Sequence, residues 1–132
     1  GRKALDDLEA QWVEATAAAW WAAAQPIAAH AGCRLIVRAV DAPAERVKKL
    51  AQALRNRPGA VVCLAARGER PQLIFTRADD AAFNMGEALR TAAAAGGRRG
   101  GGRPDWAQGG AATNEGLDAA LATAVKLINA EA

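Results

Sequence analysis

A change of hydrophobic pattern after Gly32 limits the folds open to this chain more than any other feature. The run CRLIVRAV is short, β-branched and apolar, and it ends at Asp41, which predicts a buried strand. The segment DAPAERVKKLAQALRN follows with helical periodicity, and we expect Asp41 to cap that helix and Pro43 to lie in its first turn. Its predicted inward face is Val47, Leu50, Ala51 and Leu54.

Two further apolar runs and two further helical segments complete the pattern. PGAVVCLAAR and PQLIFTR are joined across Gly68, as in an antiparallel hairpin. In NMGEALRTAAAAGG, Asn84 and Glu87 have the spacing of a capping box, and Asn114 is placed to cap a last helix. The predicted inward positions of these helices are Met85, Leu89, Ala92, Ala93, Leu117, Leu121, Ala124, Val125 and Ile128. The order of elements predicts a small α/β domain with a mixed sheet and a glycine-rich loop.

The N-terminal segment predicts a helical arm over residues 1–31, ahead of a globular domain at 32–132. We expect one helix from Leu5 to about His30. Trp12, Trp20 and Trp21 either pack on the core or form an interface, and we favour the interface. Charged residues interrupt every apolar run, so no membrane span is expected. Because the first residues are charged and do not form a signal peptide, we expect a cytoplasmic protein.

Charge and cysteine content narrow the function. The net charge of the 132-residue chain is +3, and its basic residues gather in two segments. These are Arg46, Lys48, Lys49, Arg55 and Arg57 in the first segment, and Arg98, Arg99 and Arg103 in the second. Such clusters indicate either a polyanion partner or a solvated helix face. Cys33 and Cys63 lie in apolar runs, and we expect them to be reduced thiols in the core. The sequence has a single histidine and no CxxC pair, which argues against a metal site.

The stretch GGRRGGGRPDWAQGG, from Gly96 to Gly110, is either a flexible linker or a shaped loop. Its position between two well-patterned helices favours a shaped loop. Bare glycine backbone can approach a phosphate or ribose closely, and neighbouring arginines supply charge. We expect Asp105 and Gln108 to hydrogen-bond the loop backbone. Trp106 is predicted to be a core plug rather than a stacking platform. The stretch matches neither a Walker loop nor a dinucleotide fingerprint.

This stretch resembles the GG-x-GGGRPDMAQAGG-type signature of the C-terminal domain of alanyl-tRNA synthetases, often called DHHA1. By order of elements, the resemblance covers roughly residues 32–128. The chain departs from the signature by the additional Arg99 and by Trp106 in place of Met. Its N-terminal helix is also richer in Ala and Trp than the charged coiled-coil arm common in the family.

The resemblance implies a distal tRNA-binding module of an alanine-tRNA ligase, which grips the outer corner of the tRNA and supports aminoacylation and editing. The implied partner is tRNA, with tRNA-Ala the expected one. ATP, magnesium and zinc would be used elsewhere in the parent ligase, and no catalytic residue is assigned to this chain. From the motif and the basic helix, the predicted RNA-binding residues are Gly96, Gly97, Arg98, Arg99, Gly100, Gly101, Gly102, Arg103, Pro104, Asp105, Gln108, Gly109, Gly110, Arg46, Lys48 and Lys49. We expect the basic members to form one RNA-facing surface.

Three alternatives stay open at this point. The related C-terminal domain of DHH phosphoesterases binds substrate, but there the glycine triplet is typically followed by His, where this chain has Arg103 and Pro104. A stand-alone alanyl-tRNA editing protein is not separated by these residues. The domain could instead be mainly a homodimerisation module built on the tryptophan-rich helix. Catalysis within the chain is disfavoured, because hydrolysis or phosphoryl transfer needs a metal cluster or a nucleophile with a base. The only histidine, His30, lies near the predicted end of that helix.

Overall fold

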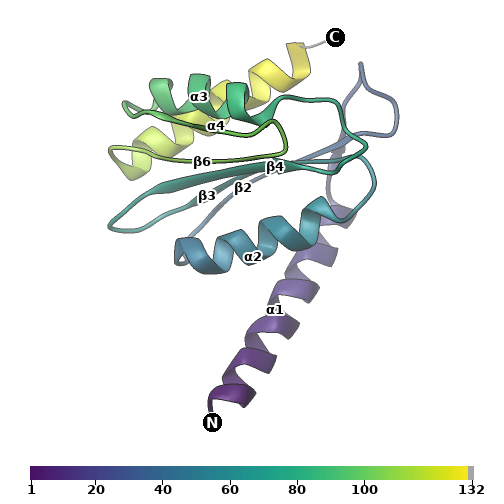
Figure 1. Cartoon of the computed structure of the whole chain (residues 1–132), viewed down its shortest axis with the longest axis vertical. Helices are drawn as coiled ribbons and strands as arrows, with labels where there is room; N and C mark the ends of the chain where they lie inside the picture. Colours follow the sequence, from purple (N-terminus) through teal and green to yellow (C-terminus); the bar gives the residue numbers. More distant parts are fainter. Residues whose placement is uncertain (131–132) are drawn as a thin grey trace.

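Residues 1–130 are described in the computed structural model, in which helices flank one mixed sheet (Figure 1). The helices are α1 (Arg2–Ala22), α2 (Ala44–Arg55), α3 (Met85–Ala95) and α4 (Asn114–Ala130). The strands are β1 (Gln25–Pro26), β2 (Arg34–Val40), β3 (Ala60–Ala66), β4 (Gln72–Arg77), β5 (Gly100–Gly102) and β6 (Trp106–Gly110). The sheet order is β1-β2-β3-β4-β6-β5, with β2 and β3 parallel and every other pair antiparallel. The predicted α/β class with a mixed sheet is therefore confirmed.

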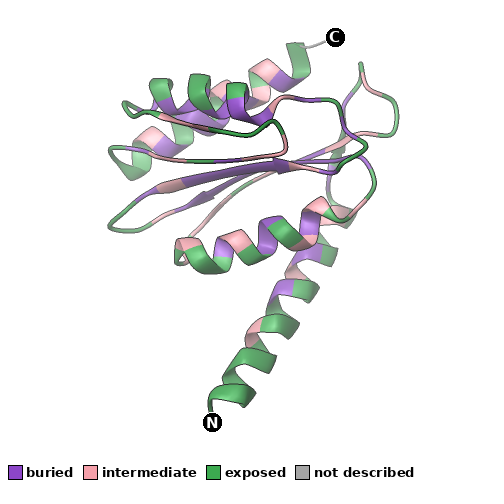
Figure 2. Ribbon diagram, viewed as in Figure 1, coloured by how far each residue is buried: buried purple, intermediate pink, exposed green. Residues whose placement is uncertain are grey.

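The sheet separates two hydrophobic clusters, because alternate residues of each strand face opposite sides. Helices α3 and α4 cover one face, and α2 covers the other with α1 beyond it (Figure 1). In β3, Cys63 belongs to the α3–α4 cluster, whereas Val62 and Leu64 belong to the α1–α2 cluster. All residues of β3 are buried, as the purple strands in Figure 2 show. A continuous apolar run is the sequence of a strand covered on both faces.

The predicted inward face of α2 is confirmed, but its predicted cap is wrong. Val47, Leu50, Ala51 and Leu54 have no exposed surface. Pro43 is the N-cap residue of α2, and the helix has no side-chain cap. Asp41 lies two residues before this N-cap position, so its side chain is not placed to accept hydrogen bonds from the free N–H groups of the first turn.

One of the two other predicted caps is confirmed. The Asn84 side chain caps α3 by accepting a 3.2 Å hydrogen bond from the Glu87 N–H. At α4, the hydroxyl of Thr113 accepts a 2.9 Å bond from the Gly116 N–H, so Thr113 performs the role predicted for Asn114. The Asn114 side chain instead accepts a 3.2 Å bond from the Gly68 N–H, which ties the start of α4 to the β3–β4 turn.

Helix α1 ends at Ala22, so the prediction of a helix to about His30 is wrong. Gln25 precedes a proline, and a residue in that position disfavours the helical conformation. Gln25 and Pro26 instead pair with β2 as a short edge strand. The interface predicted for the tryptophans stays a prediction, and among the three only Trp12 is classed as exposed, at 41%. Trp20 and Trp21 are half-buried and pack against the α1–α2 cluster.

The glycine-rich stretch between α3 and α4 contains two short strands, β5 and β6, which pair as a β-hairpin at the edge of the sheet where the sequence predicted a shaped loop. Strand β6 pairs with β4, and β5 adds outside it as the last strand. A Cβ atom at Gly100 would lie 2.5 Å from Leu89 Cδ2, and one at Gly109 would lie 2.9 Å from the same atom. A Cβ at Gly86 would lie 2.5 Å from the Gly102 carbonyl oxygen. These glycines are required because α3 packs directly onto the hairpin.

We predict that Gly100→Ala lowers the free energy of unfolding by about 1–3 kcal/mol, because the added carbon overlaps Leu89 and the paired strand. Gly101→Ala is the matched control. Its Cβ would meet nothing closer than 3.8 Å, so the change should stay within about 0.5 kcal/mol. Urea unfolding of both variants measures the difference, and equal midpoints would contradict the packing role of Gly100.

Candidate functional site

The turn between β5 and β6 is anchored by its own carbonyl groups. The Pro104 carbonyl accepts a 2.8 Å hydrogen bond from the Met85 N–H at the start of α3. The Asp105 carbonyl accepts a 2.6 Å bond from the Thr76 hydroxyl and a 3.3 Å bond from the Arg77 N–H, both in β4. The turn is therefore held by α3 on one side and by the sheet on the other.

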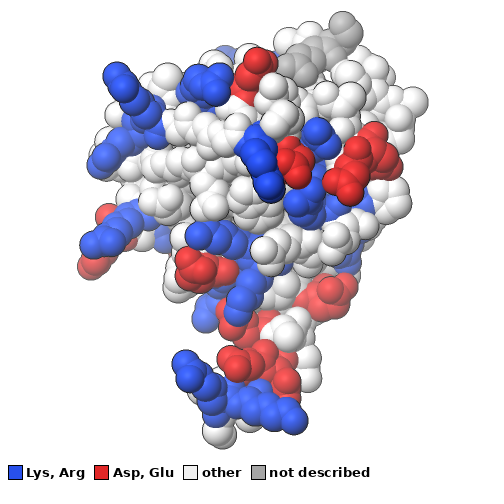
Figure 3. All heavy atoms as spheres, viewed as in Figure 1, with Lys and Arg blue, Asp and Glu red and all other residues white. Residues whose placement is uncertain are grey.

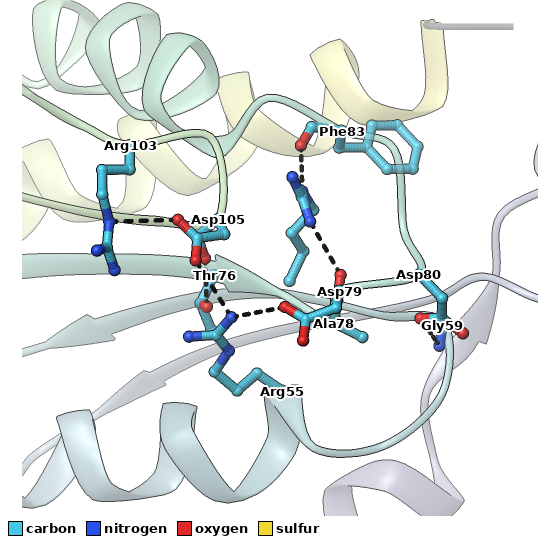
Figure 4. A network of polar contacts seen from close by, with 10 residues as sticks. Arg55, Gly59, Thr76, Ala78, Asp79, Asp80, Phe83, Arg103 and Asp105 are labelled. Atoms are coloured by element: carbon cyan, nitrogen blue, oxygen red, sulfur yellow. Dashed lines mark hydrogen bonds and ion pairs between the residues drawn. The ribbon is translucent and has the colours of Figure 1, made fainter.

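The Asp105 carboxylate is the centre of a charged network that reaches the opposite layer (Figure 4). One oxygen lies 3.3 Å from Arg103 Nε and the other lies 3.4 Å from Arg55 Nη2. The same nitrogen of Arg55 lies 3.3 Å from an Asp79 carboxylate oxygen. Arg55 belongs to α2, so this network connects the α2 layer to the hairpin turn.

The arginines of the network favour the ionised form of the Asp105 carboxyl by lowering its pKa. Burial raises the pKa of its carboxyl, but the charge of Arg103, a backbone hydrogen bond and Arg55 together lower that pKa below its usual value. The carboxylate of Asp105 forms ion pairs with Arg103 and Arg55, and its carbonyl accepts the two hydrogen bonds from β4. The prediction that Gln108 hydrogen-bonds the loop backbone is wrong. Its side-chain oxygen instead accepts a 3.1 Å hydrogen bond from the Trp106 indole N–H. Trp106 is half-buried, packs against the α1–α2 cluster and leaves part of its surface exposed.

Arg98 and Arg99 follow the end of α3 and are exposed. Gly97, with a φ of 83°, turns the chain out of the helix, and the Arg98 N–H donates a 2.9 Å bond to the Ala93 carbonyl. Neither arginine side chain forms an ion pair with any residue in the described part of the chain. In Figure 3, basic side chains project without acidic neighbours at the upper left, where Figure 1 shows α3 ending and β5 beginning.

Arg103 is separated from Arg98 and Arg99 by the whole of β5. Gly100 pairs with Gly109 at one end of the hairpin, and Gly102 pairs with Ala107 at the other end. The arginines of the motif therefore bracket the edge strand instead of gathering at one point. Strand β5 has no strand on its outer side, so its backbone borders the open edge of the sheet.

The structure does not bring Arg46, Lys48 and Lys49 of α2 together with the hairpin, although Arg55 at the end of the same helix does reach its turn. Arg46 and Lys49 lie 3.7 and 3.1 Å from Glu9 of α1, and Lys48 lies 3.2 Å from Glu45. Their charges are therefore partnered, and they lie on the layer below the sheet. A single RNA-facing surface made from both clusters does not match this arrangement. The predicted role of Arg46, Lys48 and Lys49 in RNA binding is untested, and their ion pairs disfavour it.

Arg90 of α3 lies beside the edge strand, a position that the sequence reasoning did not predict. A Cβ atom at Gly101 would lie 3.8 Å from Arg90 Nη2 and 4.0 Å from its Nε, so this guanidinium reaches the edge strand. Arg90 is exposed and forms no ion pair among residues 1–130. It lies outside the glycine motif, and only the packing of α3 along β5 reveals its position.

Other site types find little support in residues 1–130. No group of three or more His, Cys, Asp and Glu side chains there could hold a metal ion. Both cysteines are free thiols, and burial raises the pKa of each, with Asp80 raising that of Cys33 further. No helix within this range is long and apolar enough to cross a membrane.

Comparison with known proteins gives consistent matches. The model of the DHHA1 domain matches residues 32–130. "Alanine--tRNA ligase" of Pseudomonas fluorescens is 32% identical over 130 residues, which cover 92% of this chain and 15% of that protein. "Alanine--tRNA ligase" of Desulfosudis oleivorans is 39% identical over 103 residues, covering 74% of this chain and 12% of that protein. The chain thus spans less than a sixth of these relatives' length.

A solved structure is also similar. The crystal structure of the C-Ala domain from Aquifex aeolicus alanyl-tRNA synthetase superposes with a TM-score of 0.62 at 27% identity. The match covers 74% of this chain and 88% of that one.

We predict that Asp105→Asn destabilises the protein at neutral pH and has little effect in acid. The folded-state pKa of Asp105 is lowered, so its stabilising contribution is present above the ordinary value of 3.8 and is lost as the pH falls through the folded pKa. Urea midpoints of wild type and variant should differ at pH 7 and converge below pH 3.8. A difference that stays constant across this range would exclude the ionised carboxylate as the cause.

Proposed function

The chain belongs to the DHHA1 domain family, and we propose that it is the tRNA-binding C-terminal module of an alanine-tRNA ligase. The matching family model covers residues 32–130, and the relatives and the solved domain named above all come from alanine-tRNA ligases. This agreement favours the ligase over the DHH phosphoesterase and over the stand-alone editing protein. The ligase activity itself, with its ATP, magnesium and zinc, we assign to parts of the parent protein outside this chain, and we place that parent in the cytoplasm.

The observation that carries the proposal is the charge at the hairpin. Arg98 and Arg99 precede β5 without an acidic partner in the described part of the chain, and Arg103 shares the Asp105 carboxylate with Arg55. Unpaired guanidinium groups bind phosphate oxygens through charge-assisted, often bidentate, hydrogen bonds. A polyanion that lies along β5 could therefore contact arginines at both of its ends.

The shape of the edge favours a folded RNA over a sequence-specific site. Strand β5 consists of three glycines, so it offers backbone and no side chain with which to read a base edge. Folded RNA is recognised largely through its form and its backbone contacts. The outer corner of a tRNA is such a shape, and the arginines around β5 would fix its position. Because this corner is common to many tRNAs, the module would add affinity without selecting tRNA-Ala by itself.

We predict that the domain prefers a folded tRNA to a duplex RNA of the same length, and that Arg98→Ala/Arg99→Ala removes this preference. If three or four phosphates are neutralised, the plot of log affinity against log salt has a slope of roughly −2 to −3 in the wild type. The double variant should reduce the magnitude of that slope by about 1.5. Fluorescence anisotropy at several salt concentrations measures both quantities.

The matched control is Lys48→Ala/Lys49→Ala, which removes the same charge from α2. These lysines are partnered by acidic groups on the other layer, so the slope should stay near the wild-type value. An equal loss in both double variants would show that only net charge matters. Equal, weak binding of both RNAs by the wild type would refute tRNA binding by the hairpin.

A second candidate function is homodimerisation through α1. Leu5 is 68% exposed, Leu8 is 61% exposed and Trp12 is 41% exposed, and these positions lie on one side of the helix. Green ribbon dominates this free end of α1 in Figure 2. Exposed large apolar side chains that lie together are typical of an interaction surface.

If α1 is a homodimer interface, the weight-average mass in sedimentation equilibrium should rise with protein concentration. Leu5→Gln/Leu8→Gln should then sediment as a monomer, because it removes the apolar contact while keeping the helix. Wild-type protein that stays monomeric at high concentration would exclude this function. Since α1 lies in the layer away from the hairpin, the variant should bind tRNA like the wild type.

A further inference from the structure

We propose that Arg90 of α3 and Gly101 of β5 form one phosphate-binding position, which takes a backbone phosphate of the bound RNA. The inference rests on the proposed tRNA-binding function and extends it to a residue outside the glycine motif. It assigns a binding role to Arg90, and it explains why a glycine occupies a position that the packing of the fold leaves open.

Arg90 is already placed beside the edge strand. Its guanidinium lies 3.8 Å from the point where a Cβ of Gly101 would be, although the two residues belong to different elements. Leu89, the preceding residue, is fully buried against Gly100 and Gly109, so the backbone of α3 is fixed at this point. A guanidinium that is positioned before binding loses less conformational freedom when it contacts a phosphate.

Gly101 differs from the other two glycines of β5. A Cβ at Gly100 would collide with Leu89, and one at Gly102 would lie 2.6 Å from the Trp106 carbonyl oxygen. At Gly101 the nearest atoms are those of Arg90, at ordinary contact distance. Packing therefore accounts for Gly100 and Gly102 but leaves Gly101 unexplained. A bare backbone at this position keeps open the space in which an anion can reach both the strand and the guanidinium.

The charge of Arg90 is available for such an anion. Arg103 is held by Asp105, and Arg46, Lys48 and Lys49 of α2 are held by Glu9 and Glu45, whereas Arg90 has no ion pair within residues 1–130. Its planar group presents two parallel donors to phosphate oxygens. Arg90 lies along the strand between the ends marked by Arg98 and Arg103, because Gly101 is the central residue of β5.

A double-mutant cycle tests the shared position, with Arg90→Ala, Gly101→Val and the combination. Valine at Gly101 would fill the space beside the guanidinium, while a β-branched residue suits a strand. Each single change should weaken tRNA binding roughly tenfold at low salt, the effect of losing one charge-assisted contact. Arg90→Ala should also reduce the magnitude of the salt slope by roughly one. The double variant should bind no more weakly than the weaker single variant, because both changes remove the same phosphate contact.

Three further variants serve as controls. Arg2→Ala removes an equal charge at the far end of α1 and should leave affinity within about twofold of wild type. Arg90→Lys keeps the charge without the planar pair of donors, so it should retain the salt slope while losing part of the affinity. Gly101→Ala replaces Gly101→Val if thermal unfolding shows that the valine variant is not folded.

The outcomes separate this inference from the proposed function. If Arg98→Ala/Arg99→Ala loses binding while Arg90→Ala binds like the wild type, the hairpin binds RNA and the role of Arg90 is refuted. Losses that add in the double variant would show that Arg90 and Gly101 act at separate positions and would also refute the shared site. A wild-type protein without preference for folded tRNA would refute the proposed function and this inference together.

Discussion

The packing of α3 onto the β5–β6 hairpin is the contact on which the candidate site depends. Leu89 occupies space that exists only because Gly100 and Gly109 have no side chains, and Gly86 allows the start of the helix to approach the Gly102 carbonyl. Close-packed interiors tolerate little added volume, so these positions cannot accept even a methyl group without a shift. This contact also brings Arg90 to β5 and sets where Arg98 and Arg99 leave the helix.

A second constraint fixes the other end of the hairpin. The Arg103–Asp105 turn is bonded by its carbonyl groups to α3 and β4, and by the Asp105 carboxylate to Arg55 of α2. The turn therefore contacts elements of both layers of the domain. Since Asp105 is shared between Arg55 and Arg103, loss of Arg55 would leave Arg103 held more tightly by the carboxylate. The availability of Arg103 to an outside anion is consequently linked to a residue on the far side of the sheet.

Sequence periodicity predicted the elements whose apolar pattern is strong. The strands at β2, β3 and β4 and the inward faces of α2 and α3 follow directly from the spacing of their large apolar residues. The hairpin was missed because three consecutive glycines have no strand propensity, and β5 exists only through its pairing with β6. The end of α1 does not follow from the periodicity. It follows from Pro26, which disfavours the helical conformation at the preceding Gln25 and favours an extended chain. Arg90 could not be found, since its relation to Gly101 is tertiary.

The structure separates the residues of the glycine motif that packing requires from those that it leaves free. Gly100, Gly102 and Gly109 are required by contacts inside the protein, so a match to the signature indicates first of all the hairpin and the helix packed on it. The charges at the edge come largely from positions that packing leaves free, namely Arg90, Arg98 and Arg99, all of which are exposed. Arg99, one of the two residues by which this chain departs from the signature, adds a charge immediately before β5. Proteins that share this hairpin can therefore differ in the positive charge that they present at these arginine positions, while the fold that forms the edge stays the same.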